Sequence, residues 1–583
     1  MTARPRTIPW RSAALALWLA ALADAPATVW DQSISTEGPV DIHVSSAMET
    51  IPLRGHYPVR VRINNRSDQP GQWTIQTTAS PSYEPRANLR SRHTLRVDAR
   101  EARTVDLMVP VYPVHSPDRY VYPRLQIEAI GPGAVGHSIH RSGDYSAGAG
   151  YHLGMSRDLA TRSKSELEAV ATGRAEPMVV SRLALDAWPD DPRALSGLDV
   201  VLLFDTEWRD LKRSTRDALK QWLAAGGTLL VASREAEAGA LPAGLETGHG
   251  AWPADWRYGW GRVRPLPAPD GVADVQAALK WIEQQPSLYR LVSGGYQRLD
   301  WPLRREIPDV RQPLLWITVT VFIVALVIGP LNIWIAARRR RSTQLLWTTP
   351  ALSLLASAGI GLSIIWSDGT GAYGHRALFT FLIPADQLEL RLQEQTTRSG
   401  VLLNRSFHVP PEVVLSVVNA TGLPDKSSGF RRDPDGGAAG AWFTSRAIHG
   451  HLLESVQSSR SGVTLRPADD PDGAPTVWST IPATLSTLYV TGADGRHWRA
   501  GPLRAGESRT LEPVSDKDYA AAWRHLRAGG RMTRALDNVR DAPGLFFGVA
   551  EPERDAFIAS LPAIRWRSET HYIAGYLTLE ATP

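Results

Sequence analysis

The sequence has 583 residues, no cysteine and a net charge of +5. This length is enough for three or four domains. The missing cysteines exclude disulfides, thiolate metal sites and a cysteine nucleophile, and so small a net charge gives no indication of nucleic-acid binding. The mean hydropathy is slightly negative, which is typical of soluble modules with a few apolar segments and not of a polytopic transporter.

The amino terminus has the composition of an export signal. Three arginines in the first eleven residues precede the apolar run Ser12–Ala23, and the small residues Ala25 and Ala27 follow. This order is typical of a secretory signal peptide, and the run is too short for an ordinary membrane span. We expect residues 1–27 to be a signal peptide or an N-terminal anchor. Either one would export the chain that follows.

Residues 38–130 have the pattern of short strands separated by turns. Apolar residues alternate with arginines over 59–63, a turn-rich segment follows, and a second alternation covers 73–77. The pattern predicts a β-hairpin between these two strands. The spacing of the strands predicts an Ig-like β-sandwich over 38–130.

The next region alternates strands with helices. Buried strands are predicted at about 151–155, 178–183, 198–204 and 228–232. Capping residues predict helices that start at Ser163, with Glu166, and at Ser214, with Asp217. This alternation implies a mostly parallel sheet covered on both faces. We expect a Rossmann-like or flavodoxin-like α/β domain over 148–300.

Two charge-free stretches flank the run Arg338, Arg339, Arg340 and Arg341 in the middle of the chain. Each exceeds the roughly 20 residues that a helix needs to cross a bilayer, and buried helices of a soluble domain would not account for the arginines. We therefore predict transmembrane helices at 313–337 and 344–366. Because arginines in short loops stay inside the cell, loop 338–342 is predicted to be cytoplasmic, with both flanking parts outside. Gly329 and Pro330 are expected to kink the first helix.

Residues 372–583 are predicted to form a β-rich extracytoplasmic domain, a second sandwich with one helical insertion. The turn residues between 485–490 and 497–500 predict a hairpin. A helix is expected at about 516–527. The segment 424–440 is rich in Gly, Pro, Asp and Arg, which predicts a long mobile loop.

The arrangement resembles a family of uncharacterised bacterial membrane proteins with a class I glutamine-amidotransferase-like domain. The residues that carry the resemblance are LDVVLLFDTEWRDLKRSTRDALKQWLAAGGTLLVAS at 198–233 and Gly329, Pro330, Leu331 and Asn332 ahead of the arginines. It covers about 150–370. The resemblance implies an envelope protein often considered alongside MoxR-type ATPase and von Willebrand A-domain systems, and it implies no reaction.

The residues give no support for catalysis. An active amidotransferase of this kind needs a cysteine nucleophile, and no G-x-S-x-G turn replaces it. Asp205 and Glu207 are interpreted as carboxylates at a sheet edge rather than a catalytic or cation-binding pair. His449 and His451, with Glu454 nearby, are interpreted as surface histidines rather than a metal site. No catalytic residue, cofactor or metal is predicted, and the chain is expected not to be an enzyme.

One aromatic cluster is the best candidate for a binding surface: Trp252, Trp256, Tyr258 and Trp260. Aromatic rings stack on sugars, so a glycan is one conceivable ligand. The preferred interpretation is that these rings cover the edge of the sheet.

The predicted membrane topology, together with the lack of a recognisable catalytic motif, favours a non-enzymatic, membrane-anchored scaffold or accessory subunit of a bacterial cell-envelope complex. It would lie in the inner (plasma) membrane, with N- and C-terminal domains in the periplasm. The expected partners are the membrane bilayer and membrane or periplasmic proteins, with a glycan conceivable and no nucleic acid. Two alternatives stay open: a glycan-binding subunit of a polysaccharide export system, and a hydrolase or transferase with an unrecognised site.

Overall fold

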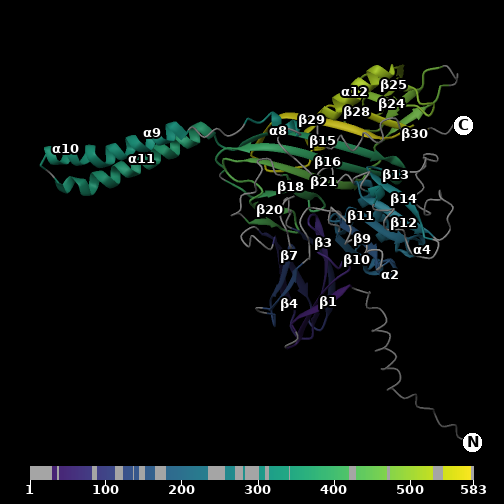
Figure 1. The fold of residues 1–583 in the computed structure, drawn as a ribbon, viewed down its shortest axis with the longest axis horizontal. Coiled ribbons are helices and arrows are strands. Elements are labelled where there is room, and N and C mark those ends of the chain that lie inside the picture. The colour runs from purple at the N-terminus through teal and green to yellow at the C-terminus, as the bar shows by residue number, and fades with distance from the viewer. Residues whose placement is uncertain are drawn as a thin grey trace, which may run out of the picture. The chain divides into compact units, whose positions relative to one another are not determined.

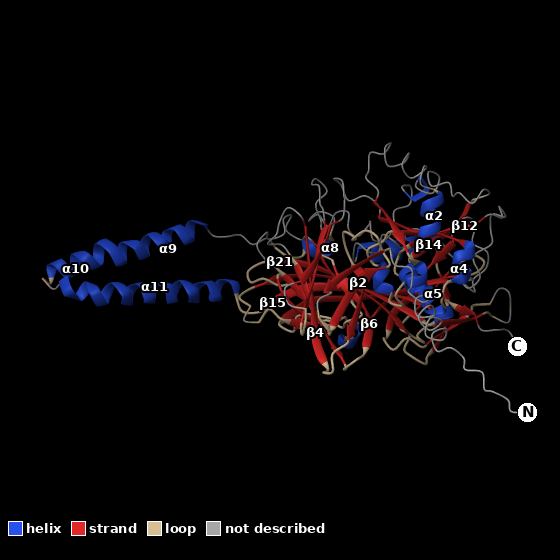
Figure 2. Cartoon of the chain, turned by 90° about the horizontal axis from the view of Figure 1, so that it is seen from below, coloured by secondary structure: helices blue, strands red, loops and turns tan. Residues whose placement is uncertain are grey.

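The chain is a multidomain, sheet-rich protein with two apolar helices, as predicted (Figures 1 and 2). The computed structural model describes residues 29–35, 38–81, 88–111, 123–134, 137–142, 152–163, 179–233, 256–268, 280–282, 301–308, 314–340, 342–402, 404–418, 429–468, 473–528 and 543–579. These residues divide into two compact units, Met1–Tyr289 and Arg290–Pro583. The predicted signal segment 1–27 lies outside the described residues.

Unit 1 begins with two sets of antiparallel strands. In the first set, the pairing order is β1-β2-β3-β6, and in the second it is β5-β4-β7-β8. The strands are β1 (Trp30–Ser35), β2 (Val40–Ser46), β3 (His56–Asn65), β4 (Gly71–Pro81), β5 (Leu89–Val97), β6 (Ala102–Pro110), β7 (Pro123–Ile130) and β8 (His137–Ser142). The predicted hairpin of 59–63 with 73–77 is wrong, because β3 and β4 pair with different partners. Both strands alternate in polarity since each has one buried face, and that pattern does not identify the partner strand.

The second part of unit 1 is a mostly parallel sheet of order β10-β9-β11-β12-β14-β13, in which β13 alone runs antiparallel to its neighbour. Its strands are β9 (His152–Ser156), β10 (Val179–Leu183), β11 (Val200–Phe204), β12 (Thr228–Ser233), β13 (Trp256–Tyr258) and β14 (Gly261–Pro267). Strand β11 is buried along its whole length, which is why its sequence is continuously apolar. The order places β9 and β11 side by side, with their successors on opposite sides.

Helices α2 (Arg157–Arg162), α4 (Asp205–Asp210) and α5 (Arg213–Ala224) belong to this sheet. Ser163 ends α2, and its predicted capping partner Glu166 lies outside the described residues. The prediction that Ser214 caps the next helix is wrong. Helix α5 already starts at Arg213, and the Ser214 hydroxyl instead donates to Asp190 at 2.7 Å.

Within unit 1, the antiparallel strands are joined to the parallel sheet by a close contact. Arg54 forms an ion pair with the buried Asp199, whose other oxygen accepts the His152 backbone N–H at 2.9 Å. A Cβ on Gly197 would lie 2.4 Å from the Cβ of Pro52. The two backbones therefore approach each other at a distance that only glycine allows.

Unit 2 contains the two apolar helical segments, which run side by side as a hairpin (Figures 1 and 2). The elements are α8 (Pro302–Arg305), α9 (Leu314–Leu326), the π-helical turn η3 (Val327–Leu331), α10 (Asn332–Arg338), the 3-10 turn η4 (Ser342–Gln344) and α11 (Leu345–Asp368). Pro330 lies inside η3. Because proline lacks a backbone N–H, the regular hydrogen-bond ladder is interrupted there.

A nine-stranded sheet of order β18-β21-β16-β15-β29-β28-β24-β25-β27 dominates the rest of unit 2. Its strands are β15 (Ala372–Ile383), β16 (Leu388–Ser399), β18 (Val414–Val418), β21 (Ile448–Ser458), β24 (Leu485–Thr491), β25 (His497–Ala500), β27 (Glu512–Pro513), β28 (Leu545–Ala550) and β29 (Ile564–Tyr576). Strands β24 and β25 form the predicted hairpin. Strand β15, which directly follows α11, pairs antiparallel with β16 and parallel with β29.

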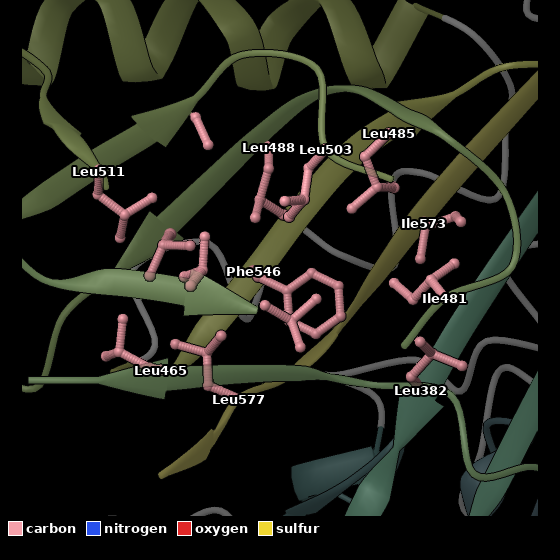
Figure 3. Close-up of a cluster of buried hydrophobic side chains, with 14 of the residues drawn as sticks. Leu382, Leu465, Ile481, Leu485, Leu488, Leu503, Leu511, Phe546, Ile573 and Leu577 are labelled. Atoms are coloured by element: carbon pink, nitrogen blue, oxygen red, sulfur yellow. The ribbon is translucent and has the colours of Figure 1, made fainter. Parts of the chain in front are cut away.

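A second sheet of unit 2, of order β26-β23-β22-β30, shares a core with the first. Its strands are β22 (Val463–Arg466), β23 (Thr476–Ser479), β26 (Ser508–Thr510) and β30 (Thr578–Leu579). Leu465 of this sheet belongs to the same cluster of buried side chains as Phe546 and Ile573 of the large one (Figure 3). Helix α12 (Asp516–Ala528) buries Trp523 against Phe547, with ring centroids 4.9 Å apart.

The prediction of a long loop at 424–440 is wrong for its second half. Strands β19 (Phe430–Arg432) and β20 (Gly437–Gly440) form a hairpin there, and β17 (Phe407–His408) pairs with β20. The turn-forming residues in this half of the segment therefore connect short strands and do not form a long loop. Residues 419–428 lie outside the described part of the chain.

Candidate functional site

The turn between the two apolar segments is positively charged. Arg338 ends α10, Arg339 caps it, and Arg340 has a positive φ of 51°. Arginines at this position also interact favourably with the negative end of the helix dipole. The Arg338 guanidinium lies over the ring of Trp334, 5.3 Å from its centroid. Arg341 lies outside the described residues.

The two apolar segments are exposed along their length. Of the most apolar 18-residue stretch in Thr318–Arg338, 11% is buried, and none of the corresponding stretch in Leu345–Leu362 is buried. A hydrogen bond from the Asn332 amide to the Thr349 hydroxyl, at 3.1 Å, joins the segments near the arginine turn. Both segments are long and apolar enough to cross a membrane, by length and composition.

Where the chain leaves α11, it enters the large sheet within three residues. Gly369 and Gly371 both have positive φ, 73° and 85°, a region that favours glycine. Their backbones hydrogen-bond to Val401: Val401 donates to the Gly369 carbonyl at 3.0 Å, and Gly371 donates to the Val401 carbonyl at 3.1 Å. The link between α11 and β15 is thus itself fixed to the segment that follows β16.

Ahead of α9, residues 301–307 pack on three strands of the same large sheet, β15, β16 and β21. Trp301 is fully buried, and its indole N–H donates to the buried carboxylate of Glu394 on β16 at 2.9 Å. A Cβ on Gly450 of β21 would lie 2.7 Å from the Trp301 ring. The Glu306 carboxylate lies 2.7 Å from Nδ1 of His375 on β15. We call residues 301–307 together with their contacts on β15, β16 and β21 the hairpin clamp.

Within the predicted aromatic cluster, the two rings that the structure describes are buried and do not form an exposed platform. Tyr258 and Trp260 are 2% and 7% exposed. The Trp260 backbone N–H donates to the Ala224 carbonyl at 3.0 Å, which places the β13–β14 turn against the end of α5. The side chain of Trp256 and all of Trp252 lie outside the described residues. Burial of the two rings is what the packing interpretation requires.

Asp205 and Glu207 lie at the carboxyl edge of the parallel sheet, in the first turn of α4. Asp205 forms an ion pair with Arg209 at 3.0 Å. Glu207 accepts the backbone N–H of Phe204 at 2.7 Å. Burial raises the pKa of the Glu207 carboxyl, while the Phe204 N–H and the Ser156 hydroxyl act in the opposite direction. These contacts are those of helix-capping carboxylates.

His451 is buried and His449 is half-buried, so their interpretation as surface histidines is wrong. His451 Nε2 lies 2.9 Å from the Trp442 carbonyl, and His449 Nε2 lies 3.0 Å from the Thr444 backbone nitrogen. Burial lowers the pKa of both, that of His451 to about 3. Glu454 is an odd number of residues away and points to the other face of the strand. Among the described residues, no group of three His, Asp or Glu could hold a metal ion.

No known family model matches the chain, and no curated protein is similar to it in sequence. Among solved structures, a Paenibacillus sp. cycloisomaltooligosaccharide glucanotransferase matches 32% of this chain and 27% of its own, at 13% identity and a TM-score of 0.16. Bacteroides uniformis beta-glucuronidase 2 matches 35% and 27%, at 9% identity and a TM-score of 0.16. The chain thus spans about a quarter of each of these two proteins.

A glycosyl hydrolase family 2 member from Bacteroides cellulosilyticus matches 94% of this chain and 78% of its own, at 9% identity and again a TM-score of 0.16. Scores this low establish neither a common fold nor a common activity.

Proposed function

We propose that this chain is a membrane-anchored, non-enzymatic scaffold or accessory subunit of a bacterial cell-envelope complex. The observation that carries the proposal is the pair of exposed apolar helices whose two ends are both attached to one sheet. Core helices of a soluble protein would be mostly buried, and these are not. A signal sequence would lie near the amino terminus, and these helices lie in the middle of the chain. A lipid bilayer removes their apolar surface from water.

The arginine turn supports one orientation of this hairpin. Arg338, Arg339 and Arg340 occupy the short connection between the helices, with Arg341 next in sequence. Such a loop stays in the cytoplasm, so both soluble parts would lie in the periplasm. A turn this short offers far less surface than a stable protein interface needs. Partners would therefore bind the periplasmic parts or the helices.

We further propose that the parallel sheet is a flavodoxin-like domain of the amidotransferase-like kind. When only the five parallel strands are numbered along the chain from β9, leaving out the antiparallel β13, the order β10-β9-β11-β12-β14 is 2-1-3-4-5, which is the flavodoxin-like order. The antiparallel strands of unit 1 would form an Ig-like sandwich beside it. With no cysteine in the chain, this domain would serve binding rather than amide hydrolysis.

Reporter fusions test the anchor and its orientation. A reporter that is active only outside the cytoplasm should be active when fused after Asp300 or after Pro583. It should be inactive when inserted within Arg338–Ser342. The reverse pattern would refute the proposed orientation, and activity at all three positions would refute the hairpin. Crosslinking in intact membranes, followed by identification of the bound proteins, would then test the scaffold role. If the chain crosslinked to no other protein, that role would be wrong.

A further inference from the structure

Three arginines surround one tyrosine at the end of the large sheet where α11 enters it. Tyr373 pairs with Arg398 of β16 on one side and with Arg565 of β29 on the other. The guanidinium of Arg567 stacks on the Tyr373 ring, 3.6 Å from its centroid. Arg565 and Arg567 are exposed, and Arg398 is half-buried. We call these four residues the arginine collar.

The collar lacks an internal counter-charge within the described part of the chain. No carboxylate there lies within salt-bridge distance of Arg398, Arg565 or Arg567, whereas the neighbouring Arg376 is bonded to Glu569. Arg398 and Arg565 flank β15 at two strand spacings, about 10 Å apart, and Arg567 lies on the same strand as Arg565. Three like charges this close repel one another. An external anion bound at the collar would remove this repulsion.

The position of the collar indicates which anion it meets. Tyr373 is five residues beyond Asp368, the last residue of α11, so the two Cα atoms are at most about 17 Å apart. The headgroup layer is about 5–7 Å deep on each side of the hydrocarbon core, and an arginine side chain adds several ångströms of reach. Tyrosine and tryptophan favour this depth, and Trp566 is next to Arg565 in sequence.

We propose that the arginine collar binds the phosphate groups of anionic glycerophospholipids in the leaflet where α11 ends. This inference rests on the membrane anchor proposed above. A guanidinium offers two parallel N–H donors to a phosphate, a geometry that combines charge with orientation. Arginines on this side do not conflict with a cytoplasmic arginine turn, because large domains translocate regardless of their charge.

The test uses the full chain in two kinds of nanodisc, one of phosphatidylcholine alone and one of phosphatidylcholine and phosphatidylglycerol in equal parts. Amide hydrogen exchange is measured over 396–402 and 563–568. We expect slower exchange with phosphatidylglycerol, and native mass spectrometry should find more of it retained. Each arginine contributes roughly a fivefold gain in affinity near an anionic surface. Arg565→Gln with Arg567→Gln should therefore weaken retention about 25-fold, while lysines at both positions should keep most of it.

The matched control removes the same charge far from the collar, with Arg460→Gln and Arg466→Gln. Arg460 follows β21 at the other end of the large sheet, and Arg466 ends β22 of the second sheet. Both arginines are exposed, and β15 spans roughly 36 Å between its ends, several times the Debye length of about 8 Å. This control should behave like the original chain.

The outcomes separate the two proposals. If the chain entered neither disc, the membrane anchor itself would be wrong. If it entered both and phosphatidylglycerol changed nothing, or if the control lost as much as the collar variant, the collar would not be a lipid site while the anchor stood. The comparison of the two discs needs no substitution, so it decides the matter even if a variant does not fold.

Discussion

Replacing Trp301 by phenylalanine should release the chain ahead of α9 from the large sheet. The change removes the indole N–H that donates to Glu394 at 2.9 Å inside the clamp. Removing the donor to a buried oxygen costs about 1–3 kcal/mol, and the smaller ring leaves a void that costs about 1 kcal/mol more. The expected loss is about 2–4 kcal/mol in the free energy of local opening.

Hydrogen exchange is the suitable measurement because the chain has several domains and does not unfold in one step. Exchange within 301–308 and 388–402 should accelerate by roughly 30-fold to several hundred-fold, since each 1.4 kcal/mol is a factor of ten. Alanine at Gly450 should act in the same direction, because its Cβ would lie 2.7 Å from the Trp301 ring.

Trp478→Phe is the matched control. Trp478 is 45% exposed in the same unit, so its replacement should change stability by less than about 0.5 kcal/mol. If Trp301→Phe left exchange within threefold of the original, the clamp would not hold the chain as the structure suggests. Equal acceleration by the control would show that the effect is not local to Glu394.

Three further predictions concern other parts of the chain. Gly197→Ala should lower the free energy of unfolding of unit 1, measured in urea, by about 1–3 kcal/mol, because the new Cβ would lie 2.4 Å from Pro52. An unchanged free energy of unfolding would refute the close contact. Asn332→Ala should weaken helix pairing in nanodiscs by about 0.6 kcal/mol through loss of the bond to Thr349, and an unchanged melting temperature of the hairpin would count against that bond. Burial holds the pKa of His451 at about 3, against about 6.5 when unfolded. Below pH 6.5 the unfolded chain binds the extra proton, so stability should fall as the pH falls toward 3, by up to about 1.4 kcal/mol per pH unit; His451→Gln should flatten this slope, and an unchanged slope would contradict it.

Strand and helix positions could be predicted where one period dominates the sequence. The mostly apolar run at 198–204 predicted a buried strand, and β11 occupies Val200–Phe204. The two charge-free stretches predicted helices, which are present at Leu314–Arg338 with its π turn and at Leu345–Asp368. Strand partners could not be predicted in the same way. Alternation identifies a buried face, but the choice between sheets depends on residues far away in the sequence.

The clamp could not be predicted because its residues carry no local signal. Glu394 lies in the polar run Gln393, Glu394, Gln395, Thr396 and Thr397, all of which are buried. A polar run normally predicts exposure. Here the run is buried because β16 lies inside the sheet, between β21 and β15. Its side chains hydrogen-bond to segments packed on the sheet, as the Gln393 side chain does to the Ile558 backbone. Only tertiary partners can satisfy such groups.

The attachment of both ends of the hairpin to one sheet bears on how a scaffold of this kind would work. A flexible linker would let the helices and the sheet move independently. Here α11 reaches β15 through three residues, of which Gly369 and Gly371 hydrogen-bond to Val401. The chain ahead of α9 is held by Trp301 and Glu306. If a partner in the membrane tilted the helices, the movement would therefore strain these contacts. It would not be taken up by a flexible linker between the helices and the sheet. If the helices are bound by such a partner, the free energy of opening the clamp sets how much of that movement the large sheet receives.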